Sequence, residues 1–391
     1  MISFEEAYKI VTTDIQPLSA EIVTLADSRG RVLSERIVSD MNMPPFDKAA
    51  VDGFACRRVD LGKALKVTAV IPAGSATAQA IEEGCCAKIM TGAMIPAGAD
   101  CVVMVEETAI AADKTVIVKN LKTKNNIAYK AEDIQQGDSV IPAHTLIKPQ
   151  HMAVMAAVGA VNPQVFRRVR LTVFSTGDEL VEPQQKPKTG QIRNSNGIQL
   201  INQAAAMGCE ARYGGIIPDD ESASRKLISE ALVWSDVLIM SGGISMGDFD
   251  YIPQILNDLG FQLHFQTIAV QPGKPTVFGR SGEKFVMALP GNPVSSLNIF
   301  ELLAKPMLYR LMGYAFEPQR ILLPLSQDYR RKRASRLAFV PARLTSESAV
   351  EPIGYHGSAH ISALVEATAL FEVPVGTDFI AKGEQVHVRF I

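Results

Sequence analysis

Three short stretches of the sequence place glycine, hydroxyl and carboxylate side chains directly after apolar runs. They read STGDE (175–179), SGGISMGDFD (241–250) and LPGNPVSS (289–296). Glycine lets backbone amides approach a ligand closely. A helix that starts after such a turn adds free N–H groups and a positive dipole end. This chemistry suits phosphate or another oxyanion, although a tight turn between a strand and a helix often needs glycine for structural reasons alone.

A fourth stretch, AVQPGKPTVFG (269–279), holds one cation in a stiff turn. Pro272, Gly273 and Pro275 surround Lys274, and fixing a lysine side chain costs up to about 2 kcal/mol of conformational entropy. We therefore expect Lys274 to face an anion at the same site. The chain contains no GxxxxGK[ST] pattern, which excludes a P-loop ATPase.

Carboxylates accompany these turns at Asp178, Glu179, Asp248 and Asp250. Beside a phosphate they would be repulsive unless a hard cation such as Mg²⁺ bridges them, or unless they bind hydroxyl and amino groups. Asp248 and Asp250 could equally be solvated acids that a helix dipole favours. The residues themselves leave these alternatives open.

The elements that position these turns are predicted from the alternation of strands and helices between 169 and 312. The apolar runs VRLTVF, ARYGGIIP, DVLIM and KFVMAL are each followed by a turn and a helical pattern. Continuous apolar strands that alternate with helices predict a parallel sheet buried on both faces. In such a sheet the three turns lie at the carboxyl edge, where ligands bind.

The rest of the chain has a different sequence pattern. Residues 41–138 contain short β-rich runs separated by Gly/Pro turns, and the residues after about 313 return to short strands. Two loops stand out, MPPFDKAAVDGFACR (43–57) and KIMTGAMIPAGADCVVM (88–104). Each is also explained by turn chemistry alone.

Composition narrows the class of protein. The net charge is −2, so nothing global indicates nucleic acid or an anionic membrane as the partner. The start of the chain lacks the apolar core of a secretory signal, and the most apolar run (152–161) is about half a membrane span. The five cysteines form no CxxC pair, and we interpret them as structural thiols in a reducing cytoplasm.

Six blocks in this order and spacing resemble the molybdopterin molybdenumtransferase family, which includes the gephyrin E domain. They are PPFD…DGFA, IMTGA.IP.GAD.VVM.E, AEDI..GD, FSTGDEL, SGG.S.GD.DY and PGKP…LPGNPVSS, and the resemblance runs from Phe4 to the C-terminus. It implies a Mg²⁺-dependent enzyme that inserts molybdenum from molybdate into adenylylated molybdopterin and releases AMP. It also implies a homodimer whose cleft lies between subunits, and it permits an adenylyltransferase as a further partner.

The expected fold class is a multidomain α/β protein. We expect a doubly wound, mostly parallel sheet in 1–18 with 169–312, and a β-rich inserted domain in 41–138. An elongated linking domain would comprise 19–40 with 139–168, and a β-barrel-like domain would comprise 313–391.

The resemblance assigns roles by motif position. It implies catalytic roles for Asp52, Thr91, Asp133, Glu179, Asp250 and Lys274, with Glu179 and Asp250 holding the metal. The expected substrate-binding residues are Ser175, Thr176, Gly177, Asp178, Ser241, Gly242, Gly243, Gly273, Pro290, Gly291, Asn292, Pro293, Ser295, Arg343 and Ser358, together with either Asp219 or Asp220.

Several positions depart from the family pattern, and most of the departures remove a cation. Gln266 and Gln271 stand where lysines are usual, and Tyr129 and Val340-Pro341 stand where arginines are usual. The usual asparagine-serine after PPFD is Lys48-Ala49, and a usual glycine is Ala131. Each charge-assisted contact contributes about 1.5–3 kcal/mol. Arg343, Lys48 or a residue of a second subunit are candidates to compensate.

These departures keep two alternatives beside the transferase. A divergent paralogue would bind the pterin nucleotide as a carrier or regulator with weak or no insertion of molybdenum. A purely structural scaffold is the third hypothesis, and the retained Asp52, Glu179, Asp250 and Lys274 argue against it.

Overall fold

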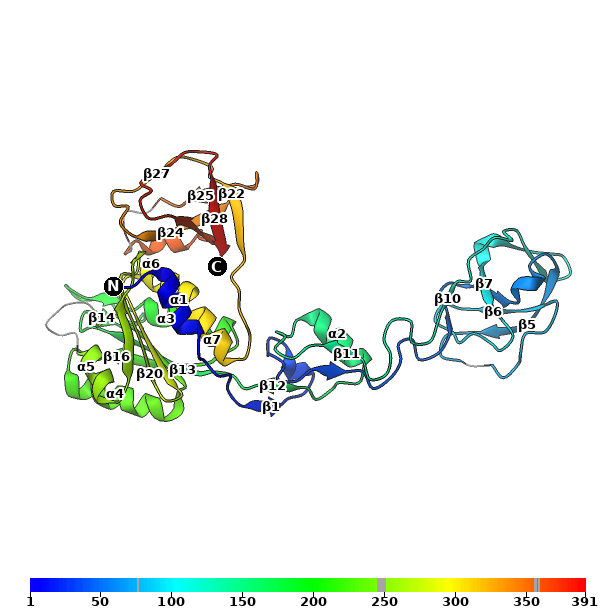
Figure 1. The fold of residues 1–391 in the computed structure, drawn as a ribbon, viewed down its shortest axis with the longest axis horizontal. Helices are drawn as coiled ribbons and strands as arrows, with labels where there is room; N and C mark the ends of the chain where they lie inside the picture. Colours follow the sequence, from blue (N-terminus) through cyan, green and yellow to red (C-terminus); the bar gives the residue numbers. More distant parts are fainter. Residues whose placement is uncertain (76, 245–250, 355–356, 358) are drawn as a thin grey trace.

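The computed structural model describes residues 1–75, 77–244, 251–354, 357 and 359–391. The molecule is elongated, with three parts arranged along its length (Figure 1). An α/β unit and a C-terminal β unit lie together at one end, a small linking unit lies in the middle, and a β-rich unit forms the other end. The fold therefore mixes helices with several separate sheets.

The α/β unit is built on a six-stranded sheet in the order β16-β13-β17-β21-β20-β18. The first four strands are parallel, and β20 is antiparallel to both of its neighbours. The strands are β13 (Arg170–Thr176), β16 (Glu210–Ile217), β17 (Val237–Ser241), β18 (Gln262–Thr267), β20 (Pro275–Ser281) and β21 (Lys284–Leu289).

Helices cover both faces of this sheet. In β17, Val237 and Ile239 belong to one hydrophobic cluster and Leu238 and Met240 to the other, as the period-2 geometry of a strand requires. One face carries α1 (Phe4–Thr12), α3 (Asn196–Ala206), α6 (Pro293–Ile299) and α7 (Lys305–Leu311). The other carries α4 (Glu221–Trp234) and α5 (Ile252–Asp258).

The helical pattern predicted after KFVMAL is interrupted. A π-helical segment, Phe300–Ala304, separates α6 from α7, which has Pro306 in its first turn. Proline lacks an N–H and clashes with the preceding turn of an α-helix, so the local hydrogen-bond pattern changes there.

The linking unit holds two short antiparallel pairs and one helix. β1 (Ala20–Ile22) pairs with β12 (Gln164–Phe166), and β2 (Ile37–Val38) pairs with β11 (Ser139–Ile141). Helix α2 (Pro149–Ala157) packs over them, and Leu33 and Met155 are fully buried in its small core.

The β-rich unit has a six-stranded sheet in the order β7-β4-β6-β5-β9-β8. The 3₁₀ turn Val105–Glu107 separates two of its short strands, β7 and β8. The strands are β4 (Gly53–Cys56), β5 (Ala64–Ile71), β6 (Cys85–Ile89), β7 (Cys101–Met104), β8 (Thr108–Ile110) and β9 (Thr115–Val118), with β3 (Lys48–Ala49) and β10 (Ile127–Ala128) as a separate pair.

The C-terminal sheet recruits a strand from the α/β unit. β19 (Val270–Gln271) pairs in parallel with β24 (Leu337–Leu344). The stretch around Lys274 therefore lies where the two units meet. The other strands of the C-terminal unit are β22 (Arg320–Pro324), β23 (Tyr329–Arg330), β25 (Val350–Pro352), β26 (Ala369–Val373), β27 (Phe379–Ile380) and β28 (Gln385–Phe390).

Within the described part of the chain, no helix has both the length and the apolar character needed to cross a bilayer.

Candidate functional site

The three glycine-containing turns converge because their strands are neighbours. β13, β17 and β21 are adjacent and parallel, so the turns after them meet at one edge of the sheet. A cavity of ≈ 730 Å³ lies there. Its described lining residues include Ser175, Thr176, Gly177, Glu179, Asn194, Ser195, Asn196, Asp219, Ser241, Gly242, Gly243, Pro290, Gly291, Asn292 and Pro293.

Two of these glycines are required by their surroundings. Gly177 has φ +131°, and a Cβ built on it would overlap the carboxylate of Glu179. Gly242 has φ +94°, and a Cβ there would lie 2.6 Å from Oγ1 of Thr176. Side chains are excluded at both positions, so the backbone of two neighbouring turns stays open toward the cavity.

A short parallel pair joins the STGDE turn to the segment before α3. β14 (Leu180–Val181) pairs with β15 (Ile192–Arg193), and the N–H of Ile192 donates to the carbonyl of Glu179 at 2.8 Å. The pair brings Arg193, Asn194 and Asn196 to the same edge of the sheet. The RNSN stretch (193–196) is thereby part of the site.

Sequence reasoning missed these residues. None of the residues expected at the site lies between Glu179 and Asp219 in the sequence. The available signal was the run of polar residues immediately before a helix that follows a strand of the same sheet. Arg193, an exposed side chain, is the cation among the cavity-lining residues that the structure describes. Its Nε donates to the carbonyls of Pro183 and Gln185, at 2.9 and 3.1 Å.

The structure separates Asp219 from Asp220. Asp219 lines the cavity, and its N–H donates to Oδ1 of Asp178 at 3.1 Å. Asp220 is the N-cap of α4, where its side chain accepts from the N–H of Ala223 at 2.7 Å. Asp219 is therefore the better candidate for the site, and Asp220 has a structural explanation.

The predicted residues outside the described lining have other surroundings. Lys274 is exposed, and Ser295 is buried in α6. Gly273 has φ +127° and abuts the side chain of Ile299. Asp250 and Ser358 fall outside the described residues. The neighbouring C-terminal residues Ala359 and Ile361 do line the cavity.

Arg343, a candidate to compensate for the missing cations, already pairs with two carboxylates. Its Nε donates to Glu351 at 2.8 Å, and its Nη1 donates to Glu366 at 2.5 Å. Binding another anion would require Arg343 to leave two carboxylates. Gln271 lies on β19, and its Oε1 is buried without a hydrogen-bond partner among the described residues.

Asp52 and Thr91, expected from the β-rich region, form a contact in the unit at the other end of the molecule. Oδ1 of Asp52 accepts from both the N–H and the Oγ1 of Thr91, at 2.6 and 2.7 Å. These bonds, the backbone bond first, lower the pKa of Asp52. Asp133 is exposed, and its backbone N–H donates to the carbonyl of Met43. The fold places the contact between Asp52 and Thr91 far from the cavity within one chain (Figure 1).

Metal-binding capacity at the cavity rests on hard oxygen ligands. Glu179 and Asp219 line the cavity, and carboxylate oxygens are ligands that Mg²⁺ binds together with substrate phosphate. Among the described residues, no group of three or more His, Cys, Asp or Glu side chains is arranged to hold a metal by itself. The donor set thus fits a cation that the substrate helps to bind.

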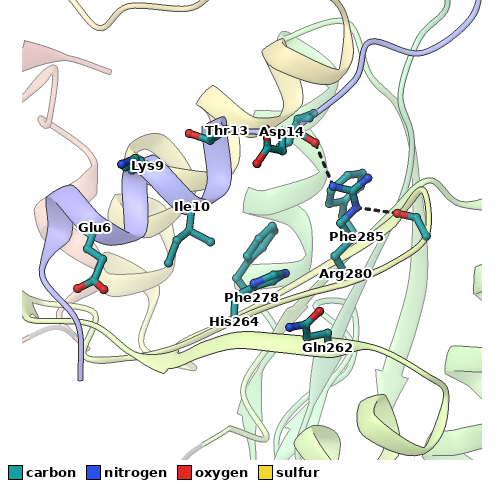
Figure 2. Close-up of a pocket in the computed structure, with 12 residues that line it drawn as sticks. Glu6, Lys9, Ile10, Thr13, Asp14, Gln262, His264, Phe278, Arg280 and Phe285 are labelled. Atoms are coloured by element: carbon teal, nitrogen blue, oxygen red, sulfur yellow. Dashed lines mark hydrogen bonds between the residues drawn. The ribbon is translucent and has the colours of Figure 1, made fainter.

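A second cavity of ≈ 700 Å³ lies between α1 and the strands β18 and β20. Figure 2 shows His264 beside Phe278, with ring centroids 5.7 Å apart, and Arg280 held by the backbone carbonyls of Asp14 and Gly282. None of the site residues expected from the sequence is among its described lining residues. The converging turns, and not cavity size, identify the candidate site.

Comparison with known proteins covers nearly the whole chain. Residues 2–159 match the model of the MoeA N-terminal region (domains I and II), residues 172–310 match a probable molybdopterin binding domain, and residues 324–391 match the MoeA C-terminal region (domain IV).

Curated relatives and a solved structure agree with these matches. The molybdopterin molybdenumtransferase of Staphylococcus epidermidis is 34% identical, covering 99% of this chain and 95% of the relative. That of a Nostoc species is 33% identical, covering 94% and 88%. The crystal structure of the molybdopterin biosynthesis MoeA protein from Pyrococcus horikoshii superposes over 100% of both chains, with a TM-score of 0.87 and 29% identity.

Proposed function

Because the chain belongs to the molybdopterin molybdenumtransferase family, we propose that it inserts molybdenum from molybdate into adenylylated molybdopterin and releases AMP. The observation that carries the proposal is the convergence of three turns on one cavity at the carboxyl edge of the sheet. Its volume of ≈ 730 Å³ lies in the range of small-molecule sites.

Open backbone at Gly177 and Gly242, together with the guanidinium of Arg193, supports binding of the anionic part of this substrate. Glu179 would hold Mg²⁺ with Asp250, and the metal would neutralise phosphate charge beside the carboxylates. Lys274, whose turn abuts the C-terminal sheet, would add a cation at the boundary of the two units.

A homodimer would complete the site. Asp52 and Thr91 belong to the β-rich unit at one end of the elongated chain, and the cavity lies at the other end (Figure 1). If both groups serve one reaction, the β-rich unit of a second copy must reach the cavity. All five cysteines are free thiols, which supports a cytoplasmic location. An adenylyltransferase would deliver the substrate there.

The test measures release of AMP by the purified protein, with adenylylated molybdopterin, Mg²⁺ and increasing molybdate. We expect Mg²⁺-dependent turnover that saturates with molybdate. Tight binding of the pterin nucleotide without turnover at any molybdate concentration would instead favour a carrier or regulator.

A second measurement concerns the missing lysine. Gln271→Lys should lower the molybdate concentration needed for half-maximal turnover about tenfold, because a charge-assisted contact is restored. An unchanged molybdate requirement would place the oxyanion away from residue 271. Gln262→Lys, at an exposed position of β18 where no lysine is expected, is the matched control.

A further inference from the structure

Two buried asparagines, Asn194 and Asn196, lie one residue apart in the segment that enters α3, and their hydrogen bonding differs. Oδ1 of Asn194 accepts from Oγ of Ser175 at 2.9 Å and from the N–H of Gly197 at 3.0 Å. Its Nδ2 donates to the phenol oxygen of Tyr213 at 2.7 Å. Asn194 is 2% exposed and both ends of its amide are satisfied. The amide of Asn194 therefore needs no ligand to satisfy its hydrogen bonding.

The orientation of Asn196 is fixed by its donors. Its Nδ2 donates to the carbonyl of Gly291 and to Oγ of Ser241, both at 2.7 Å. A backbone carbonyl can only accept, so the nitrogen of the amide must face Gly291. The hydroxyl of Ser241 donates onward to the carbonyl of Pro290 at 3.3 Å. The amide of Asn196 therefore ties the turns after β17 and β21 to the start of α3.

This orientation leaves Oδ1 of Asn196 without a donor. The residue is 8% exposed, and Oδ1 is buried with no hydrogen-bond partner among the described residues. Buried polar groups are nearly always paired, because an unpaired one loses its bond to water without replacement. Other described residues, such as Asn298 and Gln271, also carry an unpaired buried oxygen. Asn196 differs from those two in lining the cavity.

We propose that Asn196 is a specificity residue whose Oδ1 accepts a hydrogen bond from an N–H or O–H group of the pterin nucleotide. The inference rests on the proposed function and adds which chemical part of the substrate this position reads. Molybdate and ionised phosphate present only acceptor oxygens, so they do not satisfy Oδ1. The matching groups are the 2-amino group of the pterin and the 2′-hydroxyl of the ribose.

The position also discriminates between ligands. A ligand that supplies the donor forms a hydrogen bond with Oδ1 of Asn196. A ligand that lacks the donor leaves this oxygen buried and unpaired. Sites built to hydrogen-bond a particular group reject analogues without that group for this reason. Asn196 would thus direct the uncharged part of the substrate to the start of α3 and leave the open turns and Arg193 to the anionic part.

The experiment compares probe pairs that differ by one donor. Pterin is compared with pteridin-4(3H)-one, which lacks only the 2-amino group, and AMP is compared with 2′-deoxy-AMP. Dissociation constants are measured by calorimetry for the full-length protein and for Asn196→Leu, an apolar side chain of similar size. The wild type should prefer the donor-bearing member of one pair about five- to tenfold, and the variant should lose that preference. The pair that responds identifies the pterin or the ribose as the source.

Ser241→Ala is the control, because it removes one acceptor of Nδ2 and keeps the bond to Gly291 that orients the amide. The donor preference should survive in this variant, although overall affinity falls. Asn196→Ser serves as the second variant if the leucine variant does not fold.

Three results overturn the inference. They are a preference that persists in the Asn196 variants, a wild type that shows no preference in either pair, and a wild type that binds none of the four probes. AMP release by a wild type with no preference leaves the proposed function standing and removes only the role of Asn196. Absence of both binding and turnover removes both.

Discussion

At the scale of single residues, Asp52 and Thr91 make the contact most open to direct measurement. Both bonds that lower the pKa of Asp52 come from Thr91, one from its backbone and one from its hydroxyl. The same geometry recurs in the same unit at Asp113 and Thr115, whose N–H and Oγ1 donate to Oδ1 of Asp113 at 3.0 and 2.7 Å. The second pair is outside the residues expected to act in catalysis, so the chain supplies its own control.

Thr91→Val should raise the pKa of Asp52 toward its ordinary value, because the hydroxyl bond to the carboxylate is lost while the backbone bond remains. Carboxyl-carbon NMR titration measures this directly. Turnover should fall about tenfold if the ionised carboxylate takes part in the reaction. Thr115→Val should raise the pKa of Asp113 in the same way and leave turnover unchanged. Equal losses of activity in the two variants would contradict a specific role for Asp52.

At the scale of elements, the start of α4 shows how neighbouring acids divide between structure and site. Asp220 caps the helix, whereas Asp219 is one residue earlier and faces the cavity. The β14 and β15 pair has a comparable effect, since it brings the RNSN segment to the turn after β13. Short elements thus decide which of several similar side chains reach the ligand.

Asp220→Ala should lower the free energy of unfolding by about 1 kcal/mol, because α4 loses its N-cap, and should leave ligand affinity unchanged. Asp219→Ala should change the affinity for AMP with little effect on stability. Urea denaturation and calorimetry of both variants separate the two effects. The assignment of Asp219 to the site is wrong if its replacement affects stability alone.

At the scale of the whole molecule, the elongated shape sets the main functional question. The β-rich unit carrying Asp52 and the cavity carrying Glu179 lie at opposite ends of one chain (Figure 1). The linking unit between them has only a small core of its own. Assembly with a second copy is therefore the arrangement by which both groups could meet one substrate.

Mixing two inactive variants tests this arrangement. Asp52→Asn and Glu179→Gln should each be inactive alone, and co-expression should restore about 25% of wild-type activity, because half of random dimers contain one intact site. AMP release by the whole population of dimers purified from the co-expression is the measurement. Recovery fails if both residues must come from the same chain. Co-expression of two Glu179→Gln chains is the control and should remain inactive.

An ion pair at the junction of the linking and α/β units makes stability depend on pH. Arg167 donates two bonds to buried Asp236, at 2.7 and 2.9 Å, and the N–H of Arg170 donates a third. Burial alone would raise the pKa of Asp236, but these bonds hold it below its ordinary value. The stabilisation is therefore complete above the unfolded-state pKa of about 4 and is lost as pH falls through the lower folded-state pKa.

Asp236→Asn should lower the free energy of unfolding at pH 7 by about 2 kcal/mol. The difference from wild type should shrink as the pH is lowered below about 4, as urea denaturation at a series of pH values would show. Glu210→Gln removes exposed ion pairs of 3.6–3.8 Å and should cost less than about 1 kcal/mol at pH 7. A deficit of Asp236→Asn that stays constant with pH would exclude the ionised carboxylate as its cause.

The sequence by itself determined the four parallel strands of the central sheet and the turns that follow them. The run VLIM (237–240) is apolar at every position, a pattern that predicts burial on both faces, and all five residues of β17 (Val237–Ser241) are buried. The motif blocks also indicated the family, because their order and spacing can be read directly from the sequence. Local patterns of this kind do not depend on the rest of the fold.

Only the tertiary structure decided which side chains share a site. The order β13-β17-β21 puts three turns side by side, and the β14 and β15 pair adds Arg193 and Asn196 to them. The same packing engages Arg343 with two glutamates and separates Asp52 from the cavity within one chain. Strand order and ion pairing depend on contacts between residues far apart in the chain, and such contacts leave no periodic signal in the sequence.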